Sequence, residues 1–289
     1  MKVRFALRTA FLFSEPVTGH VFRIRPVPPE LPGQHVLETK LTTQPALKLS
    51  ATTDPVFGNL TLTGRIDAPH ESFEIKVEGV LEREEPMPAS AIQSGCSSLI
   101  GFAADPVCGS GDMKSSTAQF PPQPYFLYPT ALTQPGPRVL ALWESVSSDA
   151  LKIQDAGLRS LFLMHAAHRA LTYKKGATSV GTSAEEALSI GSGVCQDYSH
   201  VLICLLRLAG IPALYAAGLV AGEGPTHAWV QAWCGSRWLS LDPTHDAPAQ
   251  GAYVTLARGC DFADAALERG IFLGSARQTI ETSAEVKAL

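Results

Sequence analysis

The chain has 289 residues, about twice the roughly 150 residues of a typical domain, so its length predicts two domains. Hydrophobic residues make up 45% of the chain and charged residues 17%, which is the composition of a folded globular protein and excludes a largely disordered or fibrous one. The net charge of −4, without any run of lysine or arginine, argues against nucleic acid or an anionic membrane as a partner.

The beginning of the chain lacks the features of a targeting or membrane-spanning segment. Charged residues interrupt the apolar residues of 1–8, and no apolar stretch elsewhere approaches the roughly 20 residues that a membrane helix needs. We therefore expect a cytoplasmic protein.

The six cysteines are scattered without a CxxC pair, which predicts neither a zinc ribbon nor a dense disulfide framework. Cys96 and Cys108 could form a disulfide under oxidation, but in the cytoplasm we expect reduced thiols.

Up to about residue 82 the apolar residues recur with the period of a β-strand. In 73–78 every second residue is apolar and the residues between are charged, as on a strand with one solvent-facing side. Residues 60–63 and 47–49 repeat this pattern more briefly, and segments rich in proline and glycine separate the runs. The spacing predicts an antiparallel β-sandwich, which together with a connecting segment over 94–118 occupies residues 1–130.

Helical spacing then replaces strand spacing, and we assign residues 131–289 to a second domain. The apolar residues of 149–173 predict one long helix. Ser183 and Glu186 stand at the spacing of a capping box, which predicts a short helix that ends near Ile190.

A further helix is expected to begin at Cys195 and to end at Gly210 and Pro212. The Gly-Ser-Gly segment at 191–193 allows a tight approach of the chain to this helix. A thiol at a helix N-terminus is favoured in its thiolate form by the backbone amides and the helix dipole. The sequence therefore marks Cys195 as a candidate nucleophile, and its backbone amide is placed to stabilise an oxyanion.

Two apolar segments near the end of the domain predict a β-hairpin around the Gly-Ser pair at 235–236, the length typical of a type II′ loop. This loop pairs Trp233 with Trp238 and makes His227 and Asp242 diagonal neighbours on one face, about 7 Å apart. A shift of one residue would place Asp242 on the opposite face. The register is therefore a sharp prediction.

Cys195, His227 and Asp242 together have the residue types of a catalytic triad. The thiolate attacks a carbonyl, the imidazole transfers the proton to a leaving amine, and the carboxylate holds the imidazole in one tautomer. We assign nucleophile, general acid–base and orienting carboxylate to these residues in that order.

Several sequence blocks, in this order and at this spacing, resemble the motifs of the bacterial transglutaminase-like family. They are residues 191–200, 209–213, 227–230 and 238–244, and the Asp…Phe-Gly-Asn turn at 54–59 and the segment 258–264 are similar to the N-terminal β-domain and closing segment of that family. One departure is Leu214, where many relatives place an arginine. The resemblance covers nearly the whole chain except 94–118.

The resemblance implies an α+β protein in which the β-sandwich precedes a papain-like, transglutaminase-like core. It also implies acyl-transfer chemistry at a peptide or carboxamide bond of a peptide or protein substrate, with Cys195, His227 and Asp242 as the triad. Hydrolysis is favoured, because transfer in water requires an amine site that outcompetes solvent and no such site can be recognised in the sequence. Protein-glutamine transglutamination and a non-catalytic peptide-binding module are the alternatives. No cofactor or metal is implied, and no close pair of metal ligands is visible in the sequence.

Other candidate residues have simpler interpretations. His165 and His168 stand three residues apart on a predicted helix, yet without an acidic partner an ordinary helix face is favoured over a metal site. Asp197, His200 and His245 are expected to have supporting or structural roles. Cys204 is interpreted as a core thiol. The tryptophans Trp229, Trp233 and Trp238 fit the core, although one of them could wall the substrate cleft.

Overall fold

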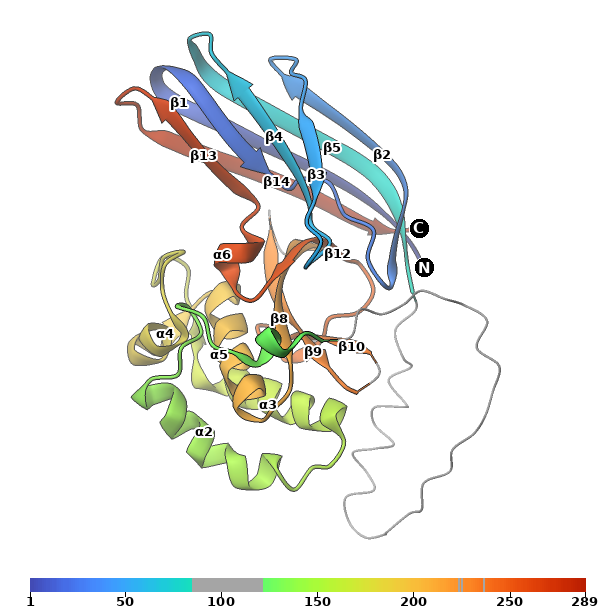
Figure 1. Cartoon of the computed structure of the whole chain (residues 1–289), viewed down its shortest axis with the longest axis vertical. Helices are drawn as coiled ribbons and strands as arrows, with labels where there is room; N and C mark the ends of the chain where they lie inside the picture. The colour runs from blue at the N-terminus through green and yellow to red at the C-terminus, as the bar shows by residue number, and fades with distance from the viewer. Residues whose placement is uncertain (85–121, 223, 225, 236) are drawn as a thin grey trace.

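The computed structural model describes residues 1–84, 122–222, 224, 226–235 and 237–289. A β-rich unit lies against a mixed unit of helices and strands (Figure 1). The predicted connecting segment over 94–118, with Cys96 and Cys108, lies outside the described residues.

The N-terminal unit is a seven-stranded antiparallel assembly organised by one long strand. Its strands are β1 (Lys2–Ile24), β2 (Gln34–Gln44), β3 (Ser50–Thr53), β4 (Leu60–Ile66), β5 (His70–Arg83), β13 (Glu268–Leu273) and β14 (Gln278–Ala288). The first half of β1 pairs with β5 and β14, and the second half pairs with β4 and β13. The ladder to β5 is irregular between Leu12 and Val17, where β1 passes from one layer to the other (Figure 1).

These two layers enclose an apolar core, so the predicted antiparallel sandwich is confirmed. Phe5 and Ile75 from one layer pack in the same buried cluster as Phe22 and Leu62 from the other. Along β5 the predicted alternation holds, because Phe73 and Ile75 are buried while the charged residues between and beyond them are not. Each fully buried aliphatic or aromatic side chain of this kind contributes roughly 1.5–3 kcal/mol.

The short strand predicted at 47–49 is not present. β2 ends at Gln44 and β3 begins only at Ser50. Pro45, at the start of the intervening segment, has no N–H to donate to a strand ladder. Leu47 and Leu49 nevertheless pack against the sandwich core, so their apolar character reflects packing from a loop.

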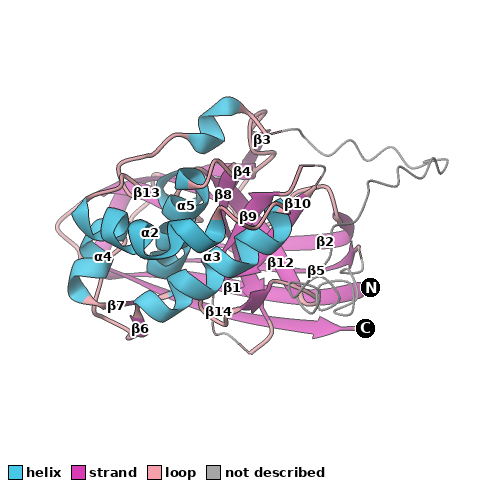
Figure 2. Ribbon diagram, turned by 90° about the horizontal axis from the view of Figure 1, so that it is seen from below, coloured by secondary structure: helices cyan, strands magenta, loops and turns pink. Residues whose placement is uncertain are grey.

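The C-terminal unit combines a five-stranded sheet with helices. Its elements are η1 (Pro124–Leu127), α2 (Pro137–Ala150), α3 (Ala156–Ala170), β6 (Thr172–Tyr173), α4 (Ala184–Ile190), β7 (Ser192–Gly193), α5 (Cys195–Leu208), β8 (Ala213–Val220), β9 (His227–Trp233), β10 (Trp238–Asp242), β11 (Ala247–Pro248), β12 (Tyr253–Gly259) and α6 (Phe262–Ala265). The strand order is β11-β10-β9-β8-β12, and α2 to α5 gather on one side of this sheet (Figure 2). No helix within the described ranges has both the length and the apolar character to cross a membrane.

Helix α5 is the centre of the C-terminal core. Its residues from Gln196 to Arg207 are all buried, and Leu202 and Leu205 are completely inaccessible to solvent. They share one apolar cluster with Ala228 and Val230 of β9. The helix begins at Cys195 as predicted and ends before Gly210, whose φ of 73° lies in the left-handed region that glycine adopts without strain.

The single long helix predicted over 149–173 is in fact two helices and a short strand. Residues 151–155 leave the helical path between α2 and α3. Asp155 then caps α3, because its side chain accepts a hydrogen bond from the amide of Leu158. The apolar spacing that predicted a continuous helix belongs to α3, and its extension on both sides was wrong.

The end of the chain returns to the N-terminal unit. β13 and β14 pair with the two halves of β1, so residues of 268–288 complete the first sheet (Figure 1). The division into 1–130 and 131–289 stays a prediction from sequence. The strand pairing shows in addition that β13 and β14, near the end of the range 131–289, belong to the sheet of the N-terminal unit.

Two amide side chains join the units by pairing with the edge strand β12. Gln34 accepts from the Thr255 amide and donates to the Thr255 carbonyl, each at 2.9 Å. Asn59, at the end of the predicted Asp…Phe-Gly-Asn turn, accepts from the Arg258 amide at 2.8 Å and donates to the Arg258 carbonyl at 2.7 Å. Each amide replaces one residue of a neighbouring strand, which satisfies backbone groups on an otherwise unpaired sheet edge.

Candidate active site

Cys195 is the first residue of α5, and the turn before it is built for close packing. The Val194 amide donates to Asp197 Oδ2 at 2.7 Å, and the Thr178 hydroxyl donates to the same oxygen at 2.7 Å. A Cβ on Gly193 would lie 2.5 Å from this carboxylate oxygen, so the predicted glycine is needed for the approach. Asp197 is thus a structural residue, as expected, that fixes the N-terminal turn and holds Cys195 at the positive end of the helix dipole.

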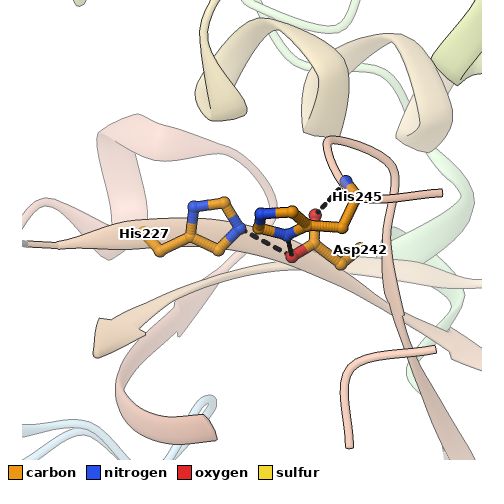
Figure 3. Close-up of side chains that lie close together, drawn as sticks. All are labelled: His227, Asp242 and His245. Atoms are coloured by element: carbon orange, nitrogen blue, oxygen red, sulfur yellow. Dashed lines mark hydrogen bonds and ion pairs between the residues drawn. The ribbon is translucent and has the colours of Figure 1, made fainter. Parts of the chain in front are cut away.

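The hairpin has the predicted register. Trp233 pairs with Trp238 and Gln231 with Ser240, as the loop at 235–236 requires. His227 and Asp242 consequently lie on one face, and His227 Nε2 is 2.7 Å from Asp242 Oδ2 (Figure 3). Both side chains are almost completely buried.

His227 links the carboxylate to the thiol. Its Nε2 faces Asp242, which leaves Nδ1 as the ring nitrogen for Cys195. Burial lowers the pKa of His227, but the interactions with Asp242 and Cys195 outweigh it and raise that pKa to about 10. His227 is the first residue of β9, so it stands at the end of the sheet where the start of α5 can reach it.

Asp242 is the most heavily hydrogen-bonded group of the site. Its Oδ2 accepts from His227, from His245 Nδ1 at 2.7 Å and from the Tyr253 hydroxyl at 2.8 Å. Its Oδ1 accepts from the Thr244 and His245 amides at 2.9 and 3.3 Å. Although burial raises the pKa of Asp242, the hydrogen bonds from His227, His245 and Tyr253 lower it to about 2. The carboxylate is therefore ionised at neutral pH.

The contribution of Tyr253 to this site was not predicted. His245 was expected to be a supporting residue, and the position three residues after Asp242 in an Asp-Pro-Thr-His turn is the local signal for its contact. Tyr253 comes from β12 and had no local signal, because its contact depends on tertiary packing. Trp229 lies beside His227 and Tyr253, with ring centroids 6.5 and 5.2 Å away.

The histidines of α3 bind the turn that follows Asp242. His165 Nδ1 contacts the Asp246 carboxylate, and His168 Nδ1 lies 2.9 Å from the Pro243 carbonyl. They therefore have separate partners and dock the helix on this turn, and Asp246 is an acidic partner of His165 that was not foreseen from the sequence.

The four described cysteines are free thiols in different environments. Burial raises the pKa of the Cys204 thiol to about 12, and Cys204 donates to the Thr133 carbonyl, in agreement with a core thiol. Burial likewise raises the pKa of Cys234 and Cys260 to about 11. Cys195 is partly exposed and differs from them in its contact with His227.

Family models match both parts of the chain. Residues 155–243 match the transglutaminase-like superfamily, and residues 3–82 match the bacterial transglutaminase-like N-terminal region. The chain therefore combines a transglutaminase-like core with a bacterial transglutaminase-like N-terminal region. The first of these ranges contains Cys195, His227 and Asp242.

Relatives of this transglutaminase-like protein match over its full length or over its core. An uncharacterized protein of Mycobacterium leprae is 27% identical over 298 residues, which cover 100% of this chain and 99% of the relative. A protein-glutamine gamma-glutamyltransferase of Pseudomonas aeruginosa is 36% identical over 116 residues, which are 34% of this chain and 17% of that enzyme. The crystal structure of a proposed cysteine protease from Cytophaga hutchinsonii superposes with a TM-score of 0.73 at 21% identity, covering 100% of this chain and 91% of that one. This structure is similar in fold.

Proposed function

We propose that the protein is a thiol-dependent enzyme that attacks a peptide or carboxamide bond of a peptide or protein substrate, and that water resolves the acyl-enzyme. One observation carries the proposal. The His227 ring is hydrogen-bonded to Asp242 through Nε2 and also interacts with Cys195, which lies at the start of a buried helix.

The first half of the reaction forms a thioester. The sulfur of Cys195 attacks the carbonyl carbon while His227 holds the thiol proton, and the carbonyl oxygen takes the negative charge. Backbone amides at the start of α5, including that of Cys195, are placed to stabilise this oxyanion. The C–N bond then breaks as His227 gives its proton to the leaving amine.

The second half restores the enzyme. His227 removes a proton from water, the resulting hydroxide attacks the thioester carbon, and the C–S bond breaks. The products are a carboxylic acid and the Cys195 thiol. Throughout the cycle the ionised Asp242 keeps the proton on Nε2, so that Nδ1 exchanges protons with sulfur, leaving amine and water.

Transfer to an amine is the second candidate function. The observation in its favour is the 36% identity of the matched segment to a protein described as a protein-glutamine gamma-glutamyltransferase. In that case a primary amine attacks the same thioester in place of water. Hydrolysis is favoured here because transfer requires a site that holds the amine against the competition of solvent.

Trapping of the acyl-enzyme tests the proposal. The full chain is mixed with a library of glutamine-containing peptides, quenched with acid and measured by intact mass, with and without a primary amine. We expect an adduct that maps to Cys195, that Cys195→Ala loses and that Cys234→Ala retains. Products that gain the amine indicate transfer, and free acids indicate hydrolysis. If peptides bind equally to the wild-type protein and to Cys195→Ala and no adduct forms, the protein is a binding module and the proposal is wrong.

A further inference from the structure

The hydrogen-bonded group of His227, Asp242 and His245 also has the ligands of a metal site. Its two ring nitrogens and one carboxylate oxygen all lie within 4.8 Å of one another (Figure 3). Imidazole nitrogen and carboxylate oxygen are common ligands of zinc and of other divalent transition metals. Asp242 and His245 are three residues apart in the sequence, and the fold brings His227 to them from the start of the neighbouring strand.

The distances are close to those of a tetrahedral site. Both His227 Nε2 and His245 Nδ1 are 2.7 Å from Asp242 Oδ2. With metal–ligand bonds of roughly 2.0–2.2 Å, tetrahedral ligand atoms are about 3.3 Å apart. Each N···O separation of 2.7 Å therefore needs to open by only about 0.6 Å to admit an ion.

Crowding at Asp242 Oδ2 is a second, independent indication. This one oxygen receives three side-chain donors, from His227, His245 and Tyr253, although a carboxylate oxygen has two lone pairs. A cation bound by both imidazoles would replace two of these donors with a single Lewis acid. The backbone amides that hold Oδ1 and the Tyr253 hydroxyl would then orient the liganding carboxylate, as outer-shell groups do at zinc sites.

The burial of the three residues sets the route of entry. Asp242 and His227 are nearly inaccessible, whereas the His245 side chain is 37% exposed. An ion therefore arrives from the side of His245, and solvent there supplies the fourth ligand. Cys195 is not needed as a ligand, since His227 uses Nε2 for this group and leaves Nδ1 for the thiol.

We propose that His227, Asp242 and His245 bind a divalent transition-metal ion such as Zn²⁺, and that the bound ion blocks the thiol chemistry. Coordination through His227 Nε2 and His245 Nδ1 releases their two protons to solvent. The proton that remains on the neutral His227 ring is then on Nδ1, the nitrogen that faces Cys195. In that state a Cys195 thiol finds no unprotonated ring nitrogen, and the Nδ1 proton could pass to the leaving amine only by leaving a metal-bound imidazolate behind, so metal binding and acyl transfer exclude each other. The blocking step rests on the proposed function, but the binding step does not.

Metal binding is tested first, on the tag-free, chelator-treated full chain. Calorimetry with Zn²⁺ and the visible absorption of added Co²⁺ measure binding without reference to activity. We expect one ion per chain and at least tenfold weaker binding by His245→Ala. His165→Ala is the matched control, because His165 is also a part-exposed histidine that contacts a carboxylate, and it should bind as the wild type does. Cys195→Ala should also retain binding. Absence of saturable binding, or equal binding by His245→Ala, overturns the proposal.

The blocking step is tested by the rate at which iodoacetamide labels Cys195, resolved by peptide mass. Saturating Zn²⁺ should slow labelling at least tenfold in the wild type and leave the rate of His245→Ala nearly unchanged. Unaltered labelling of the metal-bound wild type overturns the blocking step. If Cys195 is unreactive even without metal, the proposed function fails while the metal site stands on the binding result.

Discussion

Replacement of Asp242 by asparagine should destabilise the protein more than an isosteric change normally does. Five donors surround the carboxylate, three at Oδ2 and two at Oδ1. An asparagine side chain carries an NH₂ group in place of one oxygen. In either orientation this group meets donors, so at least two existing hydrogen bonds become repulsive contacts.

The magnitude follows from the ionisation of the carboxyl group. The pKa of Asp242 lies at about 2 in the folded protein, against an ordinary value of 3.8 for an aspartate. Because this folded pKa is depressed, the ionised group stabilises the protein above the unfolded pKa, and the stabilisation is lost as the pH falls from about 4 to 2. A shift of this size corresponds to about 2–3 kcal/mol at pH 7. We expect Asp242→Asn to lower the free energy of unfolding by at least that amount.

Urea denaturation of wild type and variant from pH 7 to pH 3 measures this effect. The difference should be largest at neutral pH and should shrink by about half at pH 3, because the carboxyl group is then mostly protonated in the unfolded chain while Asp242 of the folded protein is still mostly ionised. Asp246→Asn is the control, because this carboxylate pairs with His165 at the surface, where an ion pair is worth less than about 1 kcal/mol. Equal losses from Asp242→Asn and Asp246→Asn at pH 7, or a difference that does not change with pH, would refute the reasoning.

Two further predictions concern the packing around the site and in the sandwich. His20 is buried among phenylalanine rings, and burial together with the neighbouring His70 lowers its pKa from 6.5 to about 4, so the unfolded chain binds more protons between these pH values and the stability falls as the pH drops. His20→Phe should therefore lose about 2 kcal/mol less stability than the wild type between pH 7 and pH 5, as measured by urea titrations at both pH values. An equal loss in both proteins would contradict this prediction. A Cβ at Gly218, the partner of His227, would lie 1.9 Å from the Val254 carbonyl oxygen, so Gly218→Ala should cost about 3 kcal/mol or more in denaturant unfolding. Gly181→Ala, whose Cβ would meet only Ser179 Oγ at 3.9 Å, should stay within about 0.5 kcal/mol. Similar losses from both substitutions would rule out this packing argument.

The sequence predicted the parts of the site that local rules determine. The two-residue loop at 235–236 sets the hairpin register, because strand side chains alternate and one residue of slip would reverse every face. The start of α5 at Cys195 follows from the glycines before it, and its end follows from Gly210. The capping box of Ser183 and Glu186 formed as predicted. Each of these signals lies within a few residues of its effect.

The features that sequence reasoning missed depend on contacts between distant segments. The apolar spacing around 149–173 gave no sign that one helix would end at Ala150 and that Asp155 would cap the next one. The return of β13 and β14 to β1 joins residues more than 240 positions apart, and no local pattern specifies such a pairing. The contact of Tyr253 with Asp242 likewise arises because β12 folds back across the sheet.

The most direct test of the central claim compares the alkylation rates of the individual cysteines of the native protein at pH 7, with peptide mass mapping of each site. The contact with His227 at the start of α5 predicts that Cys195 reacts much faster than Cys204, Cys234 and Cys260, and that His227→Ala removes this advantage. A Cys195 that reacts no faster than Cys204 or Cys234, or that keeps its rate without His227, would contradict a thiol enzyme.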